Sequence, residues 1–203
     1  MCDLKLARRP IIRPDPADIT YIGNSTDFLN AWGAKVIIVE GLICSGRRTL
    51  IRDCAKSTGV AIAELEFAPC DKAIHPLTAA LCTIRLQGVV SMRYTDVVHF
   101  VDQLWNATWR DPIYPRPMSL ADVSFVIRVA DLSNLVFGCN AIGVELYTRM
   151  VDLPAVAQLC AAQRGYTMSA EVADLLQAAG RADSPRKIVN DTLTCVRYAG
   201  SRD

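Results

Sequence analysis

The chain has 203 residues, 51% of them hydrophobic, and its 22 basic side chains nearly balance its 21 acidic ones. A chain of this length and composition can bury one substantial core, so we expect a folded protein rather than an intrinsically disordered one. The net charge of +1 produces no overall field that would attract nucleic acid or an anionic membrane, so we expect neither as a partner. Any anion has to be bound at a local site.

The cysteines predict a reducing compartment rather than a metal site. Eight cysteines are scattered singly, none forms a C-x-x-C pair, and the chain has only 2 histidines. This pattern lacks the spacing of a zinc site, and we expect no metal among the site residues. Lone cysteines in apolar stretches suit the cytosol or nucleus. The basic N-terminus has no apolar segment of a secretory signal, and a mitochondrial location stays open.

The first part of the chain predicts a strand–loop–helix–strand unit. The β-branched run from Val36 to Val39 is apolar on both faces, which is typical of a buried parallel strand. Gly59 is expected to close the helix that follows. This order predicts an α/β fold with a mostly parallel central sheet. The expected elements are an irregular extension over residues 1–33 with a short helix at 25–32, a strand at 35–40, a helix at 47–57 and a strand at 60–67.

The second part continues the alternation of strands and helices, so residues 34–203 are predicted to form one domain. Gly88 opens a short apolar strand, and the run FVIRVA predicts another buried strand. Valines and a leucine at helical spacing predict a helix after Arg93. The remaining expected elements are helices at 76–86, 94–109, 132–150, 153–164 and 169–179, and strands at 122–131 and 186–191.

The loop between the first strand and its helix has the spacing of a phosphate-binding loop. In such loops, backbone N–H groups presented by glycines at a helix N-terminus surround a phosphate. Gly41 and Gly46 have the required separation, but Arg47 stands where the pattern G-x-x-x-x-G-K-[ST] has lysine, and Arg48 where it has a magnesium-binding hydroxyl. The predicted nucleotide-binding residues are Gly41, Leu42, Ile43, Cys44, Ser45, Gly46, Arg47, Arg48 and Thr49.

The string EGLICSGRRTL (residues 40–50) resembles the opening of thymidylate kinases, in the P-loop nucleoside-monophosphate kinase superfamily. Three further stretches resemble family segments in the same order: GVVSMRYTDVVHF with its Arg93–Tyr94 pair, ADVSFVIRVADLSNLVFG, and the closing strand in SPRKIVND. The deoxynucleoside kinases are a second family with a similar loop. The resemblance implies a three-layer αβα P-loop fold and, for thymidylate kinases, a homodimer.

What the resemblance implies is phosphoryl transfer from ATP and Mg²⁺ to dTMP. Arg47 would take the lysine's role as a catalytic residue, and Arg93 would orient the transferring phosphoryl group or the acceptor phosphate. Phe67 and Tyr94 would contact the acceptor, with Phe67 packing on its base.

Two function classes stay open: a divergent nucleotide kinase, and a non-catalytic descendant that serves as a binding or assembly module. Arg48 and Met92, which replace a hydroxyl and an aspartate of the family pattern, favour the second class. A thymidine kinase is a further alternative within the first.

Overall fold

The computed structural model describes residues 12–21, 24–41, 45–65, 74–98, 100, 103–113, 116–130, 141–146, 153–180 and 185–200. Its helices are α1 (Thr26–Ala31), α2 (Arg47–Ser57), α3 (Pro76–Thr83), α4 (Leu153–Ala162), α5 (Ala170–Gly180) and α6 (Pro185–Gly200), with 3-10 turns η1 (Pro16–Asp18) and η2 (Tyr94–Asp96). Its strands are β1 (Val36–Glu40), β2 (Ile62–Glu64), β3 (Gly88–Arg93), β4 (Thr108–Trp109), β5 (Met118–Ser119), β6 (Val123–Val129) and β7 (Ala141–Glu145).

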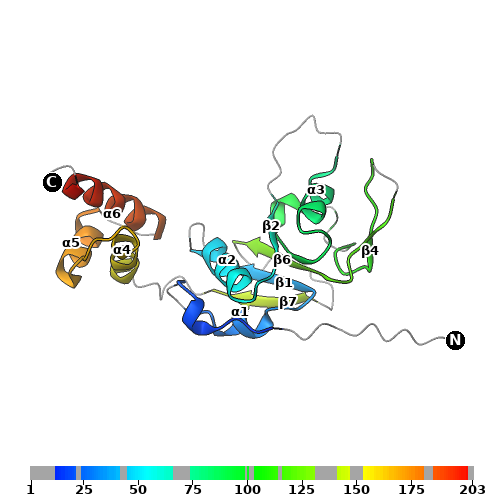
Figure 1. Cartoon of the computed structure of the whole chain (residues 1–203), viewed down its shortest axis with the longest axis horizontal. Coiled ribbons are helices and arrows are strands. Elements are labelled where there is room, and N and C mark those ends of the chain that lie inside the picture. Colours follow the sequence, from blue (N-terminus) through cyan, green and yellow to red (C-terminus); the bar gives the residue numbers. More distant parts are fainter. Residues whose placement is uncertain are drawn as a thin grey trace.

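The central sheet has five strands in the order β2-β3-β6-β1-β7, and every pairing in it is parallel (Figure 1). The short pair β4 and β5 forms a separate antiparallel ribbon. The predicted α/β fold with a mostly parallel sheet is therefore confirmed. Strand β1 lies between β6 and β7, so the strand before the glycine loop is enclosed on both edges.

The sheet separates two hydrophobic cores, which gives the molecule three layers. Val36 and Ile38 of β1 join the core under α3, whereas Ile37 and Val39 join the core under α1 and α2. This alternation follows from the two-residue period of a strand, and it explains why both faces of β1 are apolar. Phe28 of α1 is fully buried in the second core, so the described part of the N-terminal region packs against the sheet.

Three expected elements are wrong. The helix predicted over 94–109 is a 3-10 turn followed by further turns and β4, and residues 99, 101 and 102 lie outside the description. Val97 and Leu104 are nevertheless buried, because they cover the core beneath α3 from a loop, whereas Val98 is exposed. Helical spacing alone therefore does not distinguish a helix from a loop that crosses a core.

In the other two errors, a strand was predicted as part of a helix and part of a helix was predicted as a strand. Residues 141–145, expected within a helix, form β7 and pair with β1. The strand predicted at 186–191 is part of α6, which begins with Pro185 and buries Ile188 and Thr192 one turn apart. The predicted strand spans only six residues, which is too short a segment to show apolar positions recurring every four residues, as in a helix. The segments 131–140 and 147–150 lie outside the described residues.

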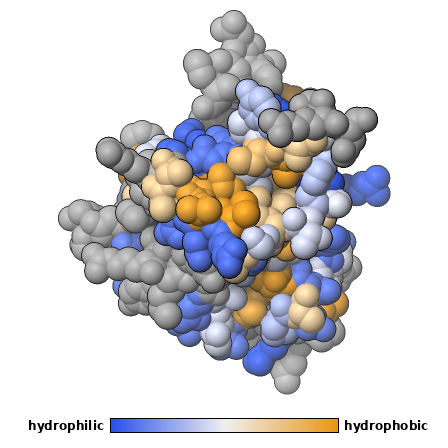
Figure 2. All heavy atoms as spheres, turned by 90° about the vertical axis from the view of Figure 1, so that its left-hand side faces the viewer, coloured by the Kyte–Doolittle hydropathy of each residue, from blue (hydrophilic) through white to orange (hydrophobic). Residues whose placement is uncertain are grey.

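Helices α4, α5 and α6 share a small core of their own, formed by Leu153, Ala157, Ala173 and Ile188. Figure 1 shows these three helices gathered beyond the sheet, at the C-terminal end of the chain. Figure 2 views the molecule from this side and shows apolar residues grouped among hydrophilic ones. Val172 and Leu175 of α5 are exposed. None of the described helices is long and apolar enough to cross a membrane.

The start of α3 contains a polar group that is sensitive to pH. His75 caps the helix, since its Nδ1 accepts a hydrogen bond of 3.1 Å from the Leu77 N–H, and its ring lies 5.1 Å from that of Trp109. The Trp109 indole donates to Thr78, which donates to the buried carboxylate of Asp111. Burial lowers the pKa of His75, and Asp111 opposes that effect.

We expect lowering the pH from about 7.5 to about 5.5 to destabilise the protein through His75. Because the pKa of His75 is lower in the folded state, the unfolded state binds more protons between the two pKa values, and stability therefore falls as the pH is lowered. Protonation also removes the acceptor for the Leu77 N–H. In His75→Asn, asparagine supplies a cap that does not titrate, so the melting temperature should fall less over this range. Equal slopes in both proteins would contradict this role.

Candidate functional site

The glycine loop lies at the carboxyl edge of the sheet, between β1 and α2. Gly46 directly precedes α2 and has a φ of 80°, a left-handed conformation that glycine adopts without strain. A Cβ on Gly46 would lie 3.0 Å from the ring of Tyr21, so the N-terminal region also closes tightly over this position. The expected strand–loop–helix geometry is present in the described residues. Leu42, Ile43 and Cys44 lie outside them.

Arg47 turns back across the loop. Its Nη1 donates to the carbonyl of Val129 at the end of β6, and this carbonyl also accepts the Gly41 N–H at 3.2 Å. The side chain passes so close to Gly41 that a Cβ there would lie 3.2 Å from the Arg47 Cδ and 2.8 Å from the Ser45 Oγ. The guanidinium predicted to replace the lysine therefore lies beside the loop, at the carboxyl ends of the adjacent strands β1 and β6.

Two buried hydroxyl groups adjoin the same loop. The Ser45 Oγ and the Tyr21 hydroxyl are enclosed and have no hydrogen-bond partner among the described residues. Burial raises the pKa of Tyr21, so its hydroxyl stays protonated and keeps a hydrogen to donate. Thr49, the last residue of the predicted loop, is exposed.

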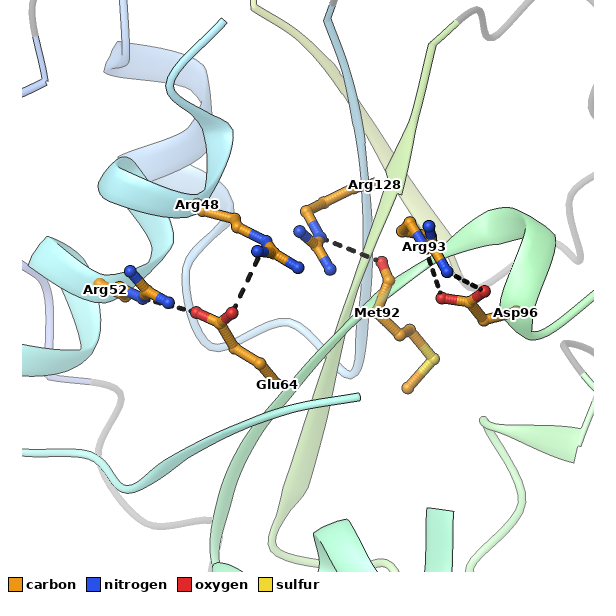
Figure 3. Close-up of polar contacts among 7 residues, drawn as sticks. All are labelled: Arg48, Arg52, Glu64, Met92, Arg93, Asp96 and Arg128. Carbon is orange, nitrogen blue, oxygen red and sulfur yellow. Dashed lines mark hydrogen bonds and ion pairs between the residues drawn. The ribbon is translucent and has the colours of Figure 1, made fainter. Parts of the chain in front are cut away.

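Arg48 points from the first turn of α2 toward the sheet, where Glu64 ends β2. The Arg48 Nε lies 3.6 Å from this carboxylate, and the Arg52 Nε lies 2.5 Å from it (Figure 3). One carboxylate therefore holds two guanidinium groups of the same helix. The side chain predicted to stand in place of a magnesium ligand is committed to an ion pair instead.

A buried arginine, Arg128 on β6, faces Arg48. Only 7% of Arg128 is exposed, its Nε donates to the Met92 carbonyl across 3.4 Å, and its Nη2 is buried with no partner in the described part of the chain. Burial, together with the positive charges of Arg48, Arg47 and Arg93, lowers the pKa of Arg128 to about 10, against an opposing effect of Glu64.

Arg93 is the cross-strand neighbour of Arg128, since the two residues are register partners in β3 and β6. Like charges at such positions repel each other. Arg93 is held by Asp96 through two hydrogen bonds of 2.8 and 2.9 Å. Tyr94, which begins η2, is only partly buried and packs at the border of the first core. We call Arg48, Arg52, Arg93 and Arg128 the arginine cluster.

The predicted acceptor-binding residues are only partly brought together. Arg93 and Tyr94 lie next to each other at the end of β3, but Phe67 falls outside the described residues. Met92 is buried in the first core, on the face of β3 opposite to Arg93. An acidic group at position 92 of this strand would therefore not point into the arginine cluster.

Sequence reasoning missed Arg128, Arg52 and Glu64. A signal existed for Arg128, because it is the only charged residue in the apolar strand VSFVIRV. The period of the strand places it on the face of α2, as it places Glu64 of β2. What the sequence did not reveal is that β6 lies next to β3, which makes Arg128 a neighbour of Arg93.

No metal centre stands out in the part of the chain that the structure describes, where no group of three or more histidine, cysteine, aspartate or glutamate side chains could hold an ion. A search against models of known protein families and a search of curated proteins both give no match to this chain.

Proposed function

We propose that this protein is a binding or assembly module that holds a nucleotide at the loop between β1 and α2 and does not transfer its phosphate. The observation that supports this proposal is the conformation of Gly46, which presents the N-terminus of α2 at the carboxyl edge of a parallel sheet. Backbone N–H groups at such a helix start favour phosphate groups, because they are unpaired donors at the positive end of the helix dipole.

The charges around the loop favour binding over transfer. Phosphoryl transfer requires a divalent cation that is held between the phosphates and the protein. Here Arg48 occupies the position of the expected hydroxyl, and a guanidinium cannot coordinate a cation. Arg47 and Arg128 add positive charge close by, which repels a cation and attracts an anion. The same groups that weaken a magnesium site therefore strengthen a phosphate site.

The assay is ATP binding and ADP formation by the purified protein. We expect ATP to bind in the presence of EDTA, and we expect no dTMP-dependent ADP with Mg²⁺ added. Arg47→Ala should weaken ATP binding by about tenfold, the effect of one charge-assisted hydrogen bond. Lys56→Ala, an exposed substitution near the opposite end of α2, should leave the Kd unchanged. Failure of the natural chain to bind ATP would refute the proposal.

The second candidate is a thymidylate kinase-like enzyme, which Arg93 at the end of β3 favours, because it could orient an acceptor phosphate. Under this alternative the natural chain forms ADP with dTMP, and Arg47→Ala abolishes turnover. A requirement for thymidine in place of dTMP would indicate a deoxynucleoside kinase. Turnover that appears only in Arg48→Thr would identify a disabled kinase and would agree with the binding proposal.

Val172 and Leu175 are exposed apolar side chains three residues apart on α5, and they support the assembly aspect of the proposal, since exposed apolar residues close together on a surface often mark contacts between proteins. A homodimer, as the family resemblance implies, is one form that such an assembly would take.

A further inference from the structure

We propose that the arginine cluster is a second anion site, which binds a phosphate group through guanidinium groups without a divalent cation. It is organised by Arg128 on β6 rather than by the glycine loop. It requires no nucleotide at that loop. Arg48 and Arg128 also contribute positive charge near the loop, so Arg93, which the proposed binding at the loop does not use, distinguishes the two sites.

Arg128 carries a buried charge whose hydrogen bonds are incompletely satisfied. Arg128 is 7% exposed, and its Nη2 has no partner among the described residues. Burying a charged group with unmet hydrogen bonds is unfavourable unless a counter-ion compensates it. Arg48, which faces Arg128 from α2, and Arg93, its cross-strand partner, increase this cost, and Glu64 opposes them. An anion between these side chains would remove both penalties.

The charge balance of the arginine cluster indicates that the anion is a phosphate. The four guanidinium groups of the arginine cluster are accompanied by the carboxylates of Glu64 and Asp96, which leaves an excess of two positive charges within the cluster, and Arg47 adds a further positive charge close to Arg128. A phosphate monoester carries a charge of about −1.5 to −2 near pH 7, so it matches this excess. A single carboxylate would neutralise only half of it. The planar forks of arginine also suit the oxygens of a phosphate.

The arginine cluster can be reached from solvent, and its outer side chains are already oriented. In Figure 3, Arg128 lies between Arg48 on one side and the Arg93–Asp96 pair on the other. The side chains of Arg48 and Arg93 are 41% and 53% exposed, so an anion can reach the cluster from solvent. Each of them is already oriented by a carboxylate, and the 3.6 Å contact of Arg48 with Glu64 is long enough to be exchanged for a closer one. Arg128 supplies the buried hydrogen-bond donor, and the more exposed Arg48 and Arg93 complete the site.

The test uses inorganic phosphate as the probe, with EDTA present and ionic strength matched by chloride. Phosphate should raise the melting temperature of the full chain as its concentration rises, from which a Kd follows. Arg128→Met should weaken phosphate binding by about tenfold or more, because it removes the buried donor. It should also melt no lower than the natural protein when phosphate is absent, since an uncompensated buried charge is gone. The matched control is Arg116→Met, an exposed arginine outside the cluster, which should leave the Kd unchanged.

A second variant and a second anion test the same site. Arg93→Gln, at an exposed side chain, should weaken phosphate binding by about threefold or more, and it decides the question if Arg128→Met does not fold. Acetate should bind at least about tenfold more weakly than phosphate, because it carries one charge. No effect of phosphate on the natural chain, an unchanged Kd in Arg128→Met or in Arg93→Gln, or equal binding of acetate would overturn the proposal.

Discussion

Replacing Phe28 with alanine is expected to lower the free energy of unfolding by about 3–5 kcal/mol. The Phe28 side chain is fully buried, and its ring lies 5.8 Å from that of Trp32. It fills the core between α1 and the sheet, beside Ile37 and Val39 of β1. Its removal would leave a cavity that the parallel sheet cannot collapse to fill, because β1 is fixed by neighbours on both edges.

Urea unfolding followed by tryptophan fluorescence measures this effect, since the three tryptophans (Trp32, Trp105 and Trp109) pack against the two cores of the sheet. The control is Asn30→Ala on the exposed face of the same helix, which should change stability by less than about 0.5 kcal/mol. A loss below about 1 kcal/mol in Phe28→Ala would mean that α1 contributes little to the core. The N-terminal region would then be the irregular extension that its sequence predicts.

Gly88→Ala is expected to cost about 3 kcal/mol or more, through two separate effects. Gly88 begins β3 with a φ of 141°, a conformation that side chains rarely adopt. A Cβ at this position would also lie 2.3 Å from the carbonyl oxygen of Ala61, which accepts the Val89 N–H. This oxygen belongs to the backbone, so the clash can be relieved only by separating β2 from β3.

Gly59→Ala is the matched control, because it isolates the effect of backbone strain. Gly59 has a φ of 65°, and a Cβ there would meet nothing within 4 Å. Its replacement should therefore cost only about 1–2 kcal/mol, the price of a left-handed conformation without a clash. Equal losses in the two variants would show that the close approach to Ala61 does not limit stability.

The parts of the fold that the sequence predicted are those determined by local chemistry. The β-branched run of β1 and the glycines around α2 specify a strand, a turn and a helix start without help from distant residues. The same is true of α4 and α5, whose periods extend over several turns. The errors arise where distant contacts decide, as in the loop that buries Val97 and Leu104 under α3. The apolar residues of this loop have the spacing of a helix, but the side chains that they contact belong to the core on the sheet.

The candidate site likewise contains residues that local spacing reveals and residues that only the tertiary structure brings together. Gly41, Gly46 and Arg47 could be found from their spacing alone. The arginine cluster could not, because its members come from α2, β3 and β6, and only the strand order brings them together. Arg128 was visible as a charge in an apolar strand, yet its meaning depends on Arg93, its register partner.

The position of β1 at the interior of the sheet affects how the protein can fold during synthesis. Both strands that flank it, β6 and β7, come from the second half of the chain. When β1 leaves the ribosome, the backbone N–H and C=O groups on both its edges are still unpaired, because β6 and β7 have not yet been synthesised. Unpaired apolar strands of this kind associate readily with other chains. A nascent chain that ends before β6 therefore exposes β1 as an unpaired, aggregation-prone strand. Productive folding of the sheet begins late, when β6 emerges from the ribosome and pairs with β1.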